Sequence, residues 1–405
     1  MVSASNAASH AAAEYLALFV GEEFVSSDGD GVIRVLPSDT QQISTILGYA
    51  TKNGLTVDPC GGGTKQHWGS GTAPHIRLSL SRINKVIDHP WQDLTCTVQA
   101  GCTWFFLQQS LAKHGQFVAL DPLFRDRATV GGILASNDSG ALRHRYGSLR
   151  DLVIGMTLVL PDGTIARTGG KVVKNVAGYD LCKLLTGSMG TLAIITEANF
   201  RLHPLPQYSR TFTVTAPNSA RLASLLAAIR GSHLLIQSLQ LQRNKTEASL
   251  DICLSSHRAA RQEVLLEGMV QAEGLALKEA NGACFEREAL FADGSTFIRA
   301  STLPTNICAF TDELQRIALK IEVTSISQGI GLHDISLRGA PDEITIAISQ
   351  MRANQKTAVT VLQSGQGVEA QAFTISAPVM SVMKAIKRNF DPNGVLGPGK
   401  LFANP

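Results

Sequence analysis

Cysteine pairs of the kind that hold metal clusters are missing from this sequence. The 405 residues include seven cysteines, none of which forms a C-x-x-C arrangement. They are Cys60, Cys96, Cys102, Cys182, Cys253, Cys284 and Cys308. Iron–sulfur and zinc sites require closely spaced thiolates, so the pattern excludes both kinds of site at their usual spacings. An odd and unpatterned set of cysteines is typical of a protein in a reducing compartment.

Long hydrophobic runs and a strong charge imbalance are absent as well. No run approaches the roughly 18 apolar residues that a membrane-spanning helix needs. Residues 1–24 are rich in alanine and serine, and no basic region precedes the apolar run that ends at Val20. We therefore expect a frayed tail and a short helix there rather than a signal peptide. The net charge of +3 is too small to indicate a nucleic-acid partner.

The length of the chain predicts more than one packed unit. A chain of 405 residues with 44% hydrophobic residues favours two or three units over a single core. We divide it into an N-terminal tail and helix (1–24), a first domain (25–206), a second domain (207–375) and a C-terminal segment (376–405). The sequence His203–Pro206 contains two prolines and is expected to link the two domains.

Short strands and helices alternate in both domains, which indicates an α+β fold. In the first domain, Ser38 and Asp39 precede apolar residues at helical spacing and predict a capped helix. The apolar positions are Ile43, Ile46, Leu47 and Ala50. In the second domain, amphipathic helices at 219–230 and 259–273 accompany several strand candidates. This order predicts an α+β domain with an antiparallel sheet.

Two glycine-rich segments carry the strongest functional signal. The first is CGGGTKQHWGSG, residues 60–71, and the second runs through residues 121–199 with small residues between short β-type runs. Consecutive glycines let backbone N–H groups converge on an anion, and the hydroxyl of Thr64 adds a further donor. Two such segments in one unit of about 200 residues indicate a large phosphate-bearing cofactor rather than a single phosphate.

Two competing nucleotide motifs fail on inspection. No G-x-G-x-x-G follows a strand candidate, so a Rossmann dinucleotide site is not expected. Residues Gly394–Lys400 match G-x-x-x-x-G-K by count, but Leu401 stands where a serine or threonine should hold Mg²⁺. Too few residues follow Lys400 to form the helix whose N-terminus would help to bind phosphate.

Taken together, residues 60–71 and 121–199 resemble the FAD-binding domain of the vanillyl-alcohol oxidase/p-cresol methylhydroxylase superfamily. The motifs VKNVAGYDL (173–181), GSMGTLAIITE (187–197) and FDPNGVLGPGKLF (390–402) resemble its glycolate oxidase branch. The resemblance implies a two-subdomain FAD-binding domain of the p-cresol methylhydroxylase (PCMH) type over residues 25–206. It also implies an α+β cap-like domain with an antiparallel sheet, and a C-terminal segment that returns to the FAD domain.

The resemblance assigns a role toward FAD to individual residues. Those of the first segment would cradle the pyrophosphate: Gly61, Gly62, Gly63 and Thr64. Those of the second segment would line the pyrophosphate and the flavin side: Pro122, Thr129, Gly131, Gly132, Ser136, Asn137, Ser139 and Gly140. Tyr146 and Gly147 are expected along the cofactor, and Lys174 and Tyr179 near the flavin ring. The adenine end is expected at Gly190, Thr191 and Ile194.

Some members of the superfamily tether FAD covalently through histidine or cysteine. His67 and Cys60 lie in the first glycine segment, but the tethering pattern of the family is not reproduced around them. We therefore expect FAD to be bound without a covalent bond.

The catalytic members of the branch carry histidine-rich motifs of the H-x-H and E-H-G type, often metal-binding, in their C-terminal half. Here that half holds only His233, His257 and His333, all isolated, and Gly397 replaces the usual asparagine before Pro-Gly. No metal site is expected, and no catalytic residue can be named. This pattern resembles the FAD-binding E subunits of glycolate oxidase/dehydrogenase.

Membership of that group implies an FAD-dependent oxidoreductase subunit with an accessory role in a hetero-oligomeric complex that acts on glycolate, a 2-hydroxy acid. The subunit would support electron transfer from a homologous catalytic flavoprotein subunit to an iron–sulfur subunit. We expect a cytoplasmic protein, with any membrane contact peripheral at the inner face of the plasma membrane or made through a partner.

Two other functions stay open on the sequence alone. The first is a stand-alone FAD-dependent 2-hydroxy acid dehydrogenase, in which Arg299, Arg338 or Lys356 would bind the substrate carboxylate. The second is an assembly module that has lost FAD.

Overall fold

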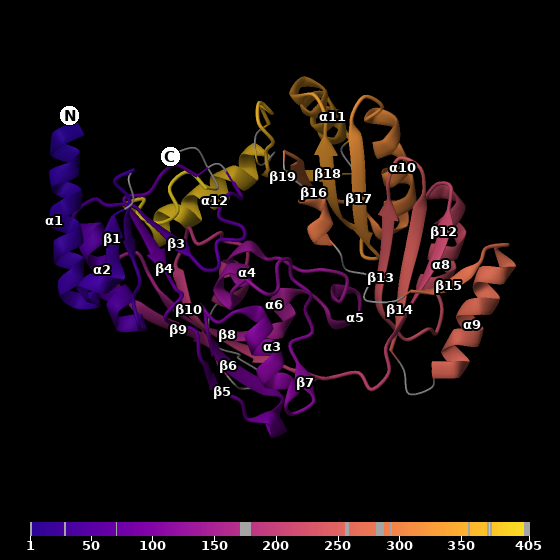
Figure 1. Ribbon diagram of the computed structural model, residues 1–405, viewed down its shortest axis with the longest axis horizontal. Helices are drawn as coiled ribbons and strands as arrows, with labels where there is room; N and C mark the ends of the chain where they lie inside the picture. Colours follow the sequence, from indigo (N-terminus) through magenta and orange to yellow (C-terminus); the bar gives the residue numbers. More distant parts are fainter. Residues whose placement is uncertain are drawn as a thin grey trace. The chain divides into compact units, whose positions relative to one another are not determined.

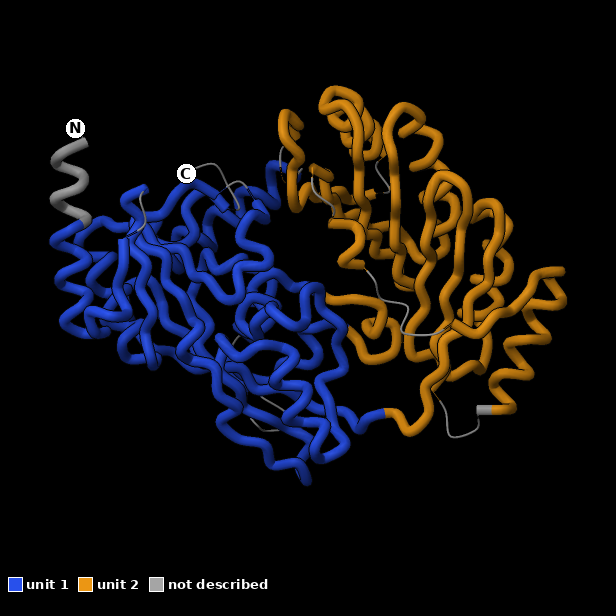
Figure 2. The backbone as a smooth tube through the Cα atoms, in the orientation of Figure 1, with its two compact units in different colours: residues 1–138, 148–205, 375–405 blue, residues 139–147, 206–374 orange. Residues whose placement is uncertain are grey.

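A computed structural model describes residues 2–27, 30–69, 71–170, 180–255, 259–280, 287–291, 294–354, 357–370, 372 and 375–400. The chain divides into two compact units, shown in different colours in Figure 2. The first unit comprises residues 1–138, 148–205 and 375–405, and the second comprises residues 139–147 and 206–374. Short 3-10 helices occur at Glu22–Phe24, Trp91–Asp93, Ala220–Leu222, Arg287–Leu290 and Pro304–Asn306.

The first unit contains two main sheets (Figure 1). The four-stranded sheet has the order β1 (Val25–Ser27), β2 (Ile33–Val35), β4 (Ile76–Ser79) and β3 (Val57–Cys60), with β4 parallel to both of its neighbours. The five-stranded sheet is antiparallel and has the order β5 (Val86–Asp88), β6 (Thr95–Gln99), β10 (Ile194–Arg201), β8 (Val153–Val159) and β9 (Ile165–Gly169). One hydrophobic core contains residues from both sheets.

The helices of this unit complete the core around the two sheets. They are α1 (Val2–Val20), α2 (Thr40–Lys52), α3 (Trp104–Ala112), α4 (Val130–Ser136), α6 (Leu149–Leu152), α7 (Leu181–Leu185) and α12 (Ala377–Phe390). The capped helix predicted after Ser38 is confirmed as α2, where the Asp39 carboxylate accepts the N–H of Gln42 at 2.8 Å. Its four predicted apolar positions are all fully buried. The expected linker at His203 begins as strand β11 (His203–Pro204), which pairs with β7 (Gln116–Phe117).

The C-terminal segment returns to the first unit, as expected. Val57 donates its backbone N–H to the carbonyl of Val395 at 2.7 Å, and Gly397 donates to the carbonyl of Val57 at 2.9 Å. These bonds extend the edge of the four-stranded sheet beside β3. The buried carboxylate of Asp391 accepts the N–H groups of Val395 and Leu396 at 2.9 and 2.8 Å, and it fixes the turn that leads to this edge.

The second unit is built on one antiparallel sheet of eight strands, which confirms the predicted α+β domain. Its order is β15 (Leu277–Ala280), β12 (Arg210–Ala216), β14 (Ala248–Leu254), β13 (Ile236–Arg243), β17 (Glu322–Gln328), β18 (Leu332–Arg338), β16 (Thr296–Ser301) and β19 (Ala358–Gln363). Its helices are α5 (Arg143–Tyr146), α8 (Ala223–Arg230), α9 (Ala259–Ala272), α10 (Ile307–Ile317) and α11 (Pro341–Ala353). Alternate residues of the strands form two hydrophobic clusters with α8, α9, α10 and α11.

Residues 139–147 interrupt the first unit in sequence but pack with the second. The carbonyl oxygen of Ser139 accepts hydrogen bonds from Arg287 Nη1 at 3.2 Å and from Gln328 Nε2 at 3.1 Å. Arg145 Nη1 donates to the carbonyl of Ser255 at 3.2 Å. These bonds hold the segment on the eight-stranded sheet.

His333 on β18 is part of the packing of the second unit. Its ring is fully buried, with Nδ1 2.7 Å from Ser327 Oγ and Nε2 2.9 Å from Thr302 Oγ1. The ring of Phe310 lies against it, with 4.4 Å between the centroids. Burial lowers the pKa of His333 to about 3, so the imidazole stays neutral in the folded protein at any pH near neutrality.

We predict that His333 makes the fold sensitive to acid. An unfolded histidine takes up a proton below about pH 6.5, whereas the folded one does so only near pH 3. Unfolding therefore consumes a proton between these values, and the free energy of unfolding falls as the pH drops below 6.5. At pH 5 the loss from this one group is about 2 kcal/mol relative to pH 7.

Urea unfolding at pH 7 and pH 5 checks this prediction. His333→Gln is expected to remove about 2 kcal/mol of the difference between the two pH values. His10→Gln serves as the matched control, because the His10 side chain is 78% exposed. An unchanged pH dependence in His333→Gln would show that folding does not lower the pKa of this ring.

Candidate functional site

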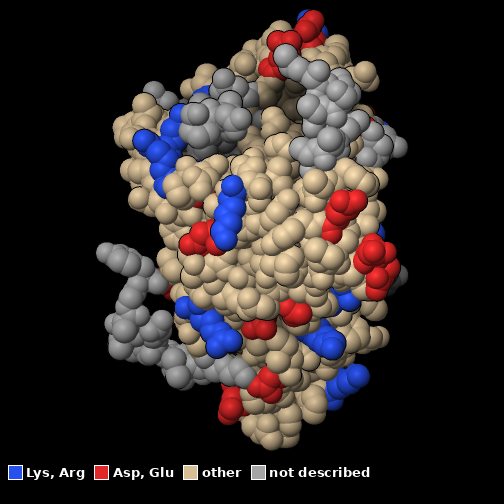
Figure 3. Space-filling view, turned by 90° about the vertical axis from the view of Figure 1, so that its left-hand side faces the viewer, with Lys and Arg blue, Asp and Glu red and all other residues tan. Residues whose placement is uncertain are grey.

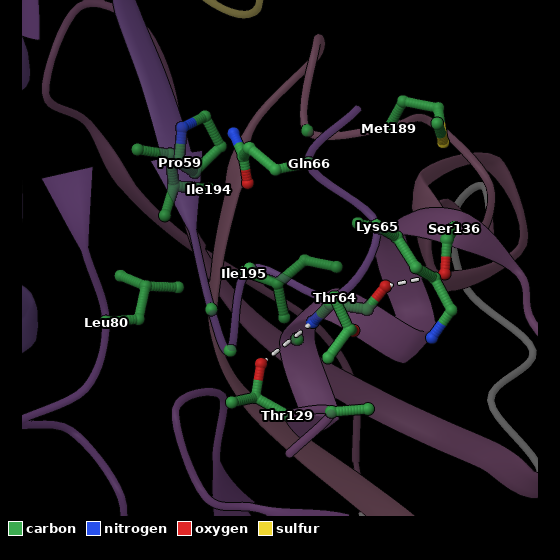
Figure 4. Close-up of a pocket in the computed structure, with 18 of the residues that line it drawn as sticks. Pro59, Thr64, Lys65, Gln66, Leu80, Thr129, Ser136, Met189, Ile194 and Ile195 are labelled. Carbon is green, nitrogen blue, oxygen red and sulfur yellow. Dashed lines mark hydrogen bonds between the residues drawn. The ribbon is translucent and has the colours of Figure 1, made fainter. Parts of the chain in front are cut away.

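A cleft in the first unit brings the two glycine-rich segments together (Figure 4). It contains about 730 Å³ of empty space, part of which is open to solvent. Residues from the two segments line most of it: Gly61, Gly62, Gly63, Thr64, Lys65 and Gln66 from the first, and Ala128, Thr129, Gly131, Gly132, Ala135, Ser136, Met189, Gly190, Ala193, Ile194 and Ile195 from the second.

The glycines allow the two segments to touch each other. A Cβ on Gly61 would overlap the hydroxyl of Thr129, and one on Gly62 would overlap the carbonyl oxygen of Arg127. The physical reason for these two glycines is therefore contact between protein segments, in addition to the approach of a ligand that we expected. Gly63 is different, because its φ of 70° favours glycine while no atom lies within 4 Å of a Cβ there.

Two further glycines of the cleft are also fixed by packing. A Cβ on Gly131 would lie 2.8 Å from the Cβ of Ala100. Gly190 has a φ of 73°, and a Cβ there would lie 2.7 Å from Cγ of Pro59. The wall of the cleft consequently presents peptide groups at these positions, which is the chemistry that binds a diphosphate through N–H donors.

The polar side chains Thr129 and Ser136 form hydrogen bonds with the backbone of helix α4 itself. Thr129 Oγ1 accepts the N–H of Gly132 at 3.4 Å and begins the helix, while Ser136 Oγ donates to the carbonyl of Gly132 at 2.7 Å (Figure 4). Asn137 ends α4 in the left-handed region, with φ 49°. These bonds set the curvature of the backbone on one side of the cleft.

Most of the residues expected at the cofactor line this one cleft. They are Gly61, Gly62, Gly63, Thr64, Thr129, Gly131, Gly132, Ser136, Gly190 and Ile194. Three more belong to the first unit but are not among the lining residues: Pro122, Asn137 and Thr191. Four belong to the second unit: Ser139, Gly140, Tyr146 and Gly147. Lys174 and Tyr179 lie outside the described residues.

Sequence reasoning missed the charged residues of the cleft. Lys65 and Lys400 both line it, and each is paired with a buried carboxylate. Lys65 Nζ lies 3.1 Å from Asp138 Oδ2, which also accepts the N–H of Leu123 at 2.7 Å. The available signal was the position of each lysine directly after a glycine-containing motif, in GGGTK and GPGK. Nothing in the sequence marked the two aspartates.

The second lysine is contributed by the C-terminal segment. Lys400 Nζ lies 2.7 Å from Asp58 Oδ1, and the amide of Gln66 donates to the other oxygen of Asp58. Burial, with a smaller contribution from Asp58, raises the pKa of the Cys60 thiol nearby. Cys60 is therefore protonated near neutral pH, and a thiol is a far weaker nucleophile than a thiolate.

The second unit holds the residues considered for a substrate carboxylate. Arg299 Nε lies 2.7 Å from Asp334 Oδ1, and Arg287 Nη1 lies 2.9 Å from Asp334 Oδ2. The half-exposed Arg338 pairs with Glu322 at 3.7 Å. Lys356 and His257 lie outside the described residues, and His233 is exposed. Within the described ranges, no group of three His, Cys, Asp or Glu residues is arranged to hold a metal ion.

Comparison with known families decides which cofactor fits the cleft. Residues 33–169 match the family model described as FAD binding domain. The protein carries an FAD-binding domain. The fit agrees with the structure, because glycines at the contact between the two segments leave peptide groups on the wall of the cleft. FAD is therefore the cofactor, as the sequence predicted.

Curated relatives are oxidoreductases that align along much of the chain. The glycolate oxidase subunit GlcD of Bacillus subtilis is 26% identical over 416 residues, with 91% of this chain and 88% of that protein covered. A mitochondrial D-lactate dehydrogenase (cytochrome) of Arabidopsis thaliana is 27% identical, with 91% and 73% covered. A D-2-hydroxyglutarate dehydrogenase of Xanthomonas citri pv. viticola is 33% identical over 196 residues, with 48% and 42% covered. The chain is an FAD-dependent oxidoreductase related to these proteins.

Solved structures show the same fold at low sequence identity. A substrate-bound p-cresol methylhydroxylase superposes with a TM-score of 0.76 at 15% identity, covering 98% of this chain and 97% of that one. An alkyldihydroxyacetonephosphate synthase superposes with a TM-score of 0.70 at 17% identity, covering 90% and 75%. The predicted PCMH-type architecture is therefore confirmed.

The surface carries charges of both signs, in keeping with the small net charge of +3. On the face drawn in Figure 3, lysine and arginine side chains lie among aspartates and glutamates on a largely uncharged surface. No helix in the part of the chain that the structure describes has both the length and the hydropathy needed to span a bilayer.

We predict that Gly62→Ala weakens FAD binding. The added Cβ overlaps a backbone carbonyl, so the two glycine-rich segments must separate at the cleft wall. Such overpacking costs about 2 kcal/mol, or roughly 30-fold in affinity. Titration of the flavin-free protein with FAD, followed by flavin fluorescence, gives the affinity. Gly268→Ala in α9 is the control, because no atom lies within 4 Å of its Cβ position. Equal affinity of both variants for FAD would contradict the prediction.

Proposed function

We propose that this chain is the FAD-bearing accessory subunit of a glycolate (2-hydroxy acid) oxidase/dehydrogenase complex. Its partners would be a homologous catalytic flavoprotein subunit and an iron–sulfur subunit, and its role would be to support electron transfer between them. The complex would be cytoplasmic, with any membrane contact peripheral at the inner face of the plasma membrane or made through a partner.

The observation that carries this proposal is the state of the ionisable groups in the second unit. Oxidation of a 2-hydroxy acid needs a base for the hydroxyl proton and a cation for the carboxylate. Here His333 is held between two hydroxyl groups with a pKa of about 3, which makes it a poor base. Arg287 and Arg299 both lie on the buried carboxylate of Asp334. These groups hold the fold together, while the cofactor cleft is fully formed.

The proposed cofactor contacts comprise the residues that line the cleft and the other residues expected from the sequence. We assign Gly61, Gly62, Gly63 and Thr64 to the pyrophosphate, and Gly190, Thr191 and Ile194 to the adenine end. We assign Thr129, Gly131, Gly132, Ser136 and their neighbours Pro122, Asn137, Ser139 and Gly140 to the pyrophosphate and flavin side, with Tyr146, Gly147, Lys174 and Tyr179 along the flavin. The proposed extent of the FAD-binding domain remains residues 25–206. When bound, FAD supplies the capacity to accept and pass on electrons.

We predict that the isolated subunit does not oxidise 2-hydroxy acids. Under anaerobic conditions, glycolate or D-lactate is expected to leave the visible flavin absorbance of the purified chain unchanged. Chemical reduction with dithionite should bleach the same sample, which shows that its flavin can accept electrons. Rapid bleaching by either hydroxy acid in the absence of partners would instead identify a stand-alone dehydrogenase. Purification from its native source, with identification of the associated chains and their iron content, tests the proposed partners directly.

We also predict that the flavin is bound without a covalent bond. The raised pKa of the Cys60 thiol supports this, because a protonated thiol attacks the flavin poorly. His67 is not among the residues that line the cleft. After acid precipitation, all of the flavin should appear in the supernatant. Yellow colour or fluorescence that stays with the denatured polypeptide on a gel would contradict the prediction.

A further inference from the structure

Lys400 occupies an unusual position in the cofactor cleft. It is the last residue of the Gly394–Lys400 motif, which has no role as a P-loop in this fold. Its side chain is 10% exposed and lines the same cleft as the two glycine-rich segments. Burial of an ammonium is unfavourable unless the charge is paired with a carboxylate or contacts a ligand. The question is therefore whether Lys400 serves only its partner or also the cofactor.

The backbone around Lys400 is fixed against the first glycine-rich segment. Thr72 donates its N–H to the carbonyl of Pro398 at 3.0 Å. The carbonyl oxygen of Lys400 would lie 2.6 Å from a Cβ on Gly69. The absence of a side chain at Gly69 therefore permits the close approach of the two segments. These contacts hold the side chain of Lys400 at the cleft whether or not its ion pair exists.

The ion pair orients the ammonium without using all of its donors. Asp58 is 6% exposed, and one of its oxygens lies 2.7 Å from Lys400 Nζ while the other accepts from Gln66. An ammonium has three N–H donors, and among the described residues Asp58 is the only ion-pair partner of Lys400. Gln66 also lines the cleft. Lys400 thus places a cation with spare donors at a cleft that is also lined by peptide groups, polar and apolar side chains, and the paired ammonium of Lys65.

We propose that Lys400 is a cofactor-binding residue, with its ammonium facing an anionic group of FAD. The diphosphate is the permanent anion of FAD, and the reduced flavin ring is the other group that carries negative charge. Peptide N–H groups of the glycine-rich segments offer dipoles but no net charge, so a lysine adds what they lack. This inference depends on FAD binding and not on the accessory role proposed above.

Three variants separate a cofactor role from a structural one: Lys400→Met, Asp58→Asn, and the double variant. Lys400→Met should weaken FAD binding on the order of tenfold, the loss expected for one charged hydrogen bond. Asp58→Asn keeps the cation and removes the competing carboxylate, so FAD affinity should be equal or higher. The double variant replaces the pair by neutral groups of similar shape and should bind FAD as weakly as Lys400→Met.

The double variant distinguishes a cofactor-binding role of Lys400 from a purely structural one. If Lys400 only neutralises Asp58, removing both charges restores the affinity of the unaltered protein, and that result would overturn the proposal. The comparison holds even where Lys400→Met alone fails to fold, because the double variant leaves no unpaired buried charge. Lys400→Arg should recover part of the affinity. Lys320→Met with Glu343→Gln is the control, since this pair belongs to the second unit and does not line the cleft.

Two further measurements identify the anion. Competition of ADP against FAD should weaken in parallel with FAD binding if Lys400 faces the diphosphate. A changed flavin reduction potential with unaltered ADP competition would place Lys400 at the flavin ring instead. Both results support a cofactor contact, and neither uses turnover of a hydroxy acid. They therefore stand whether or not the isolated chain oxidises glycolate.

Discussion

The first unit depends on the contact between two stretches of chain that are far apart in sequence. Gly61 and Gly62 lie against Thr129 and Arg127 so closely that no side chain fits between them. This contact gives the cleft a wall of peptide groups, and it also sets the separation of the helix and strands around it. Close packing of this kind leaves little freedom to adjust. The geometry of this wall, to which we assign the diphosphate of FAD, is therefore a by-product of how the unit is held together.

In both units, ionisable groups are neutralised in buried pairs. Lys65 is paired with Asp138, Lys400 with Asp58, and Arg287 with Asp334. Breaking such a pair by removing one partner is more costly than replacing both, because the remaining charge stays buried. Each pair also joins segments that are distant in the chain. The pairs consequently favour one arrangement of loops over others that would bury the same apolar area.

Much of the fold could be predicted because its signals are local. Helix α2 follows from Asp39 and four apolar residues at helical spacing, and the antiparallel sheet follows from the order of strand and helix candidates. The meeting of the two glycine-rich segments could also be predicted, since both have the composition of an anion-binding backbone. The predicted reason for Gly61 and Gly62 was incomplete, because it considered the ligand and not the neighbouring segment.

The charged residues of the cleft could not be predicted in the same way. Asp58 and Asp138 have ordinary sequence surroundings, and their importance comes from lysines that meet them only in the folded chain. The same holds for Ser139, which sequence continuity places with Asn137 and the cofactor segment. Its partners Arg287 and Gln328 come from much later in the chain. Contacts between residues so far apart in the chain produce no periodic pattern in the sequence, so they could not be predicted from it.

The adjacent residues Asp138 and Ser139 belong to different units, and this has a consequence for how the protein can be recombined with its relatives. Asp138 binds Lys65 in the first unit, and Ser139 binds Arg287 in the second. Neither unit is a contiguous piece of the gene product. A chimaera that exchanges residues 206–374 alone would leave 139–147 facing a foreign sheet. Exchange of the second unit between relatives therefore requires both pieces to be exchanged together, so the sheet is inherited with a short segment that interrupts the sequence of the first unit.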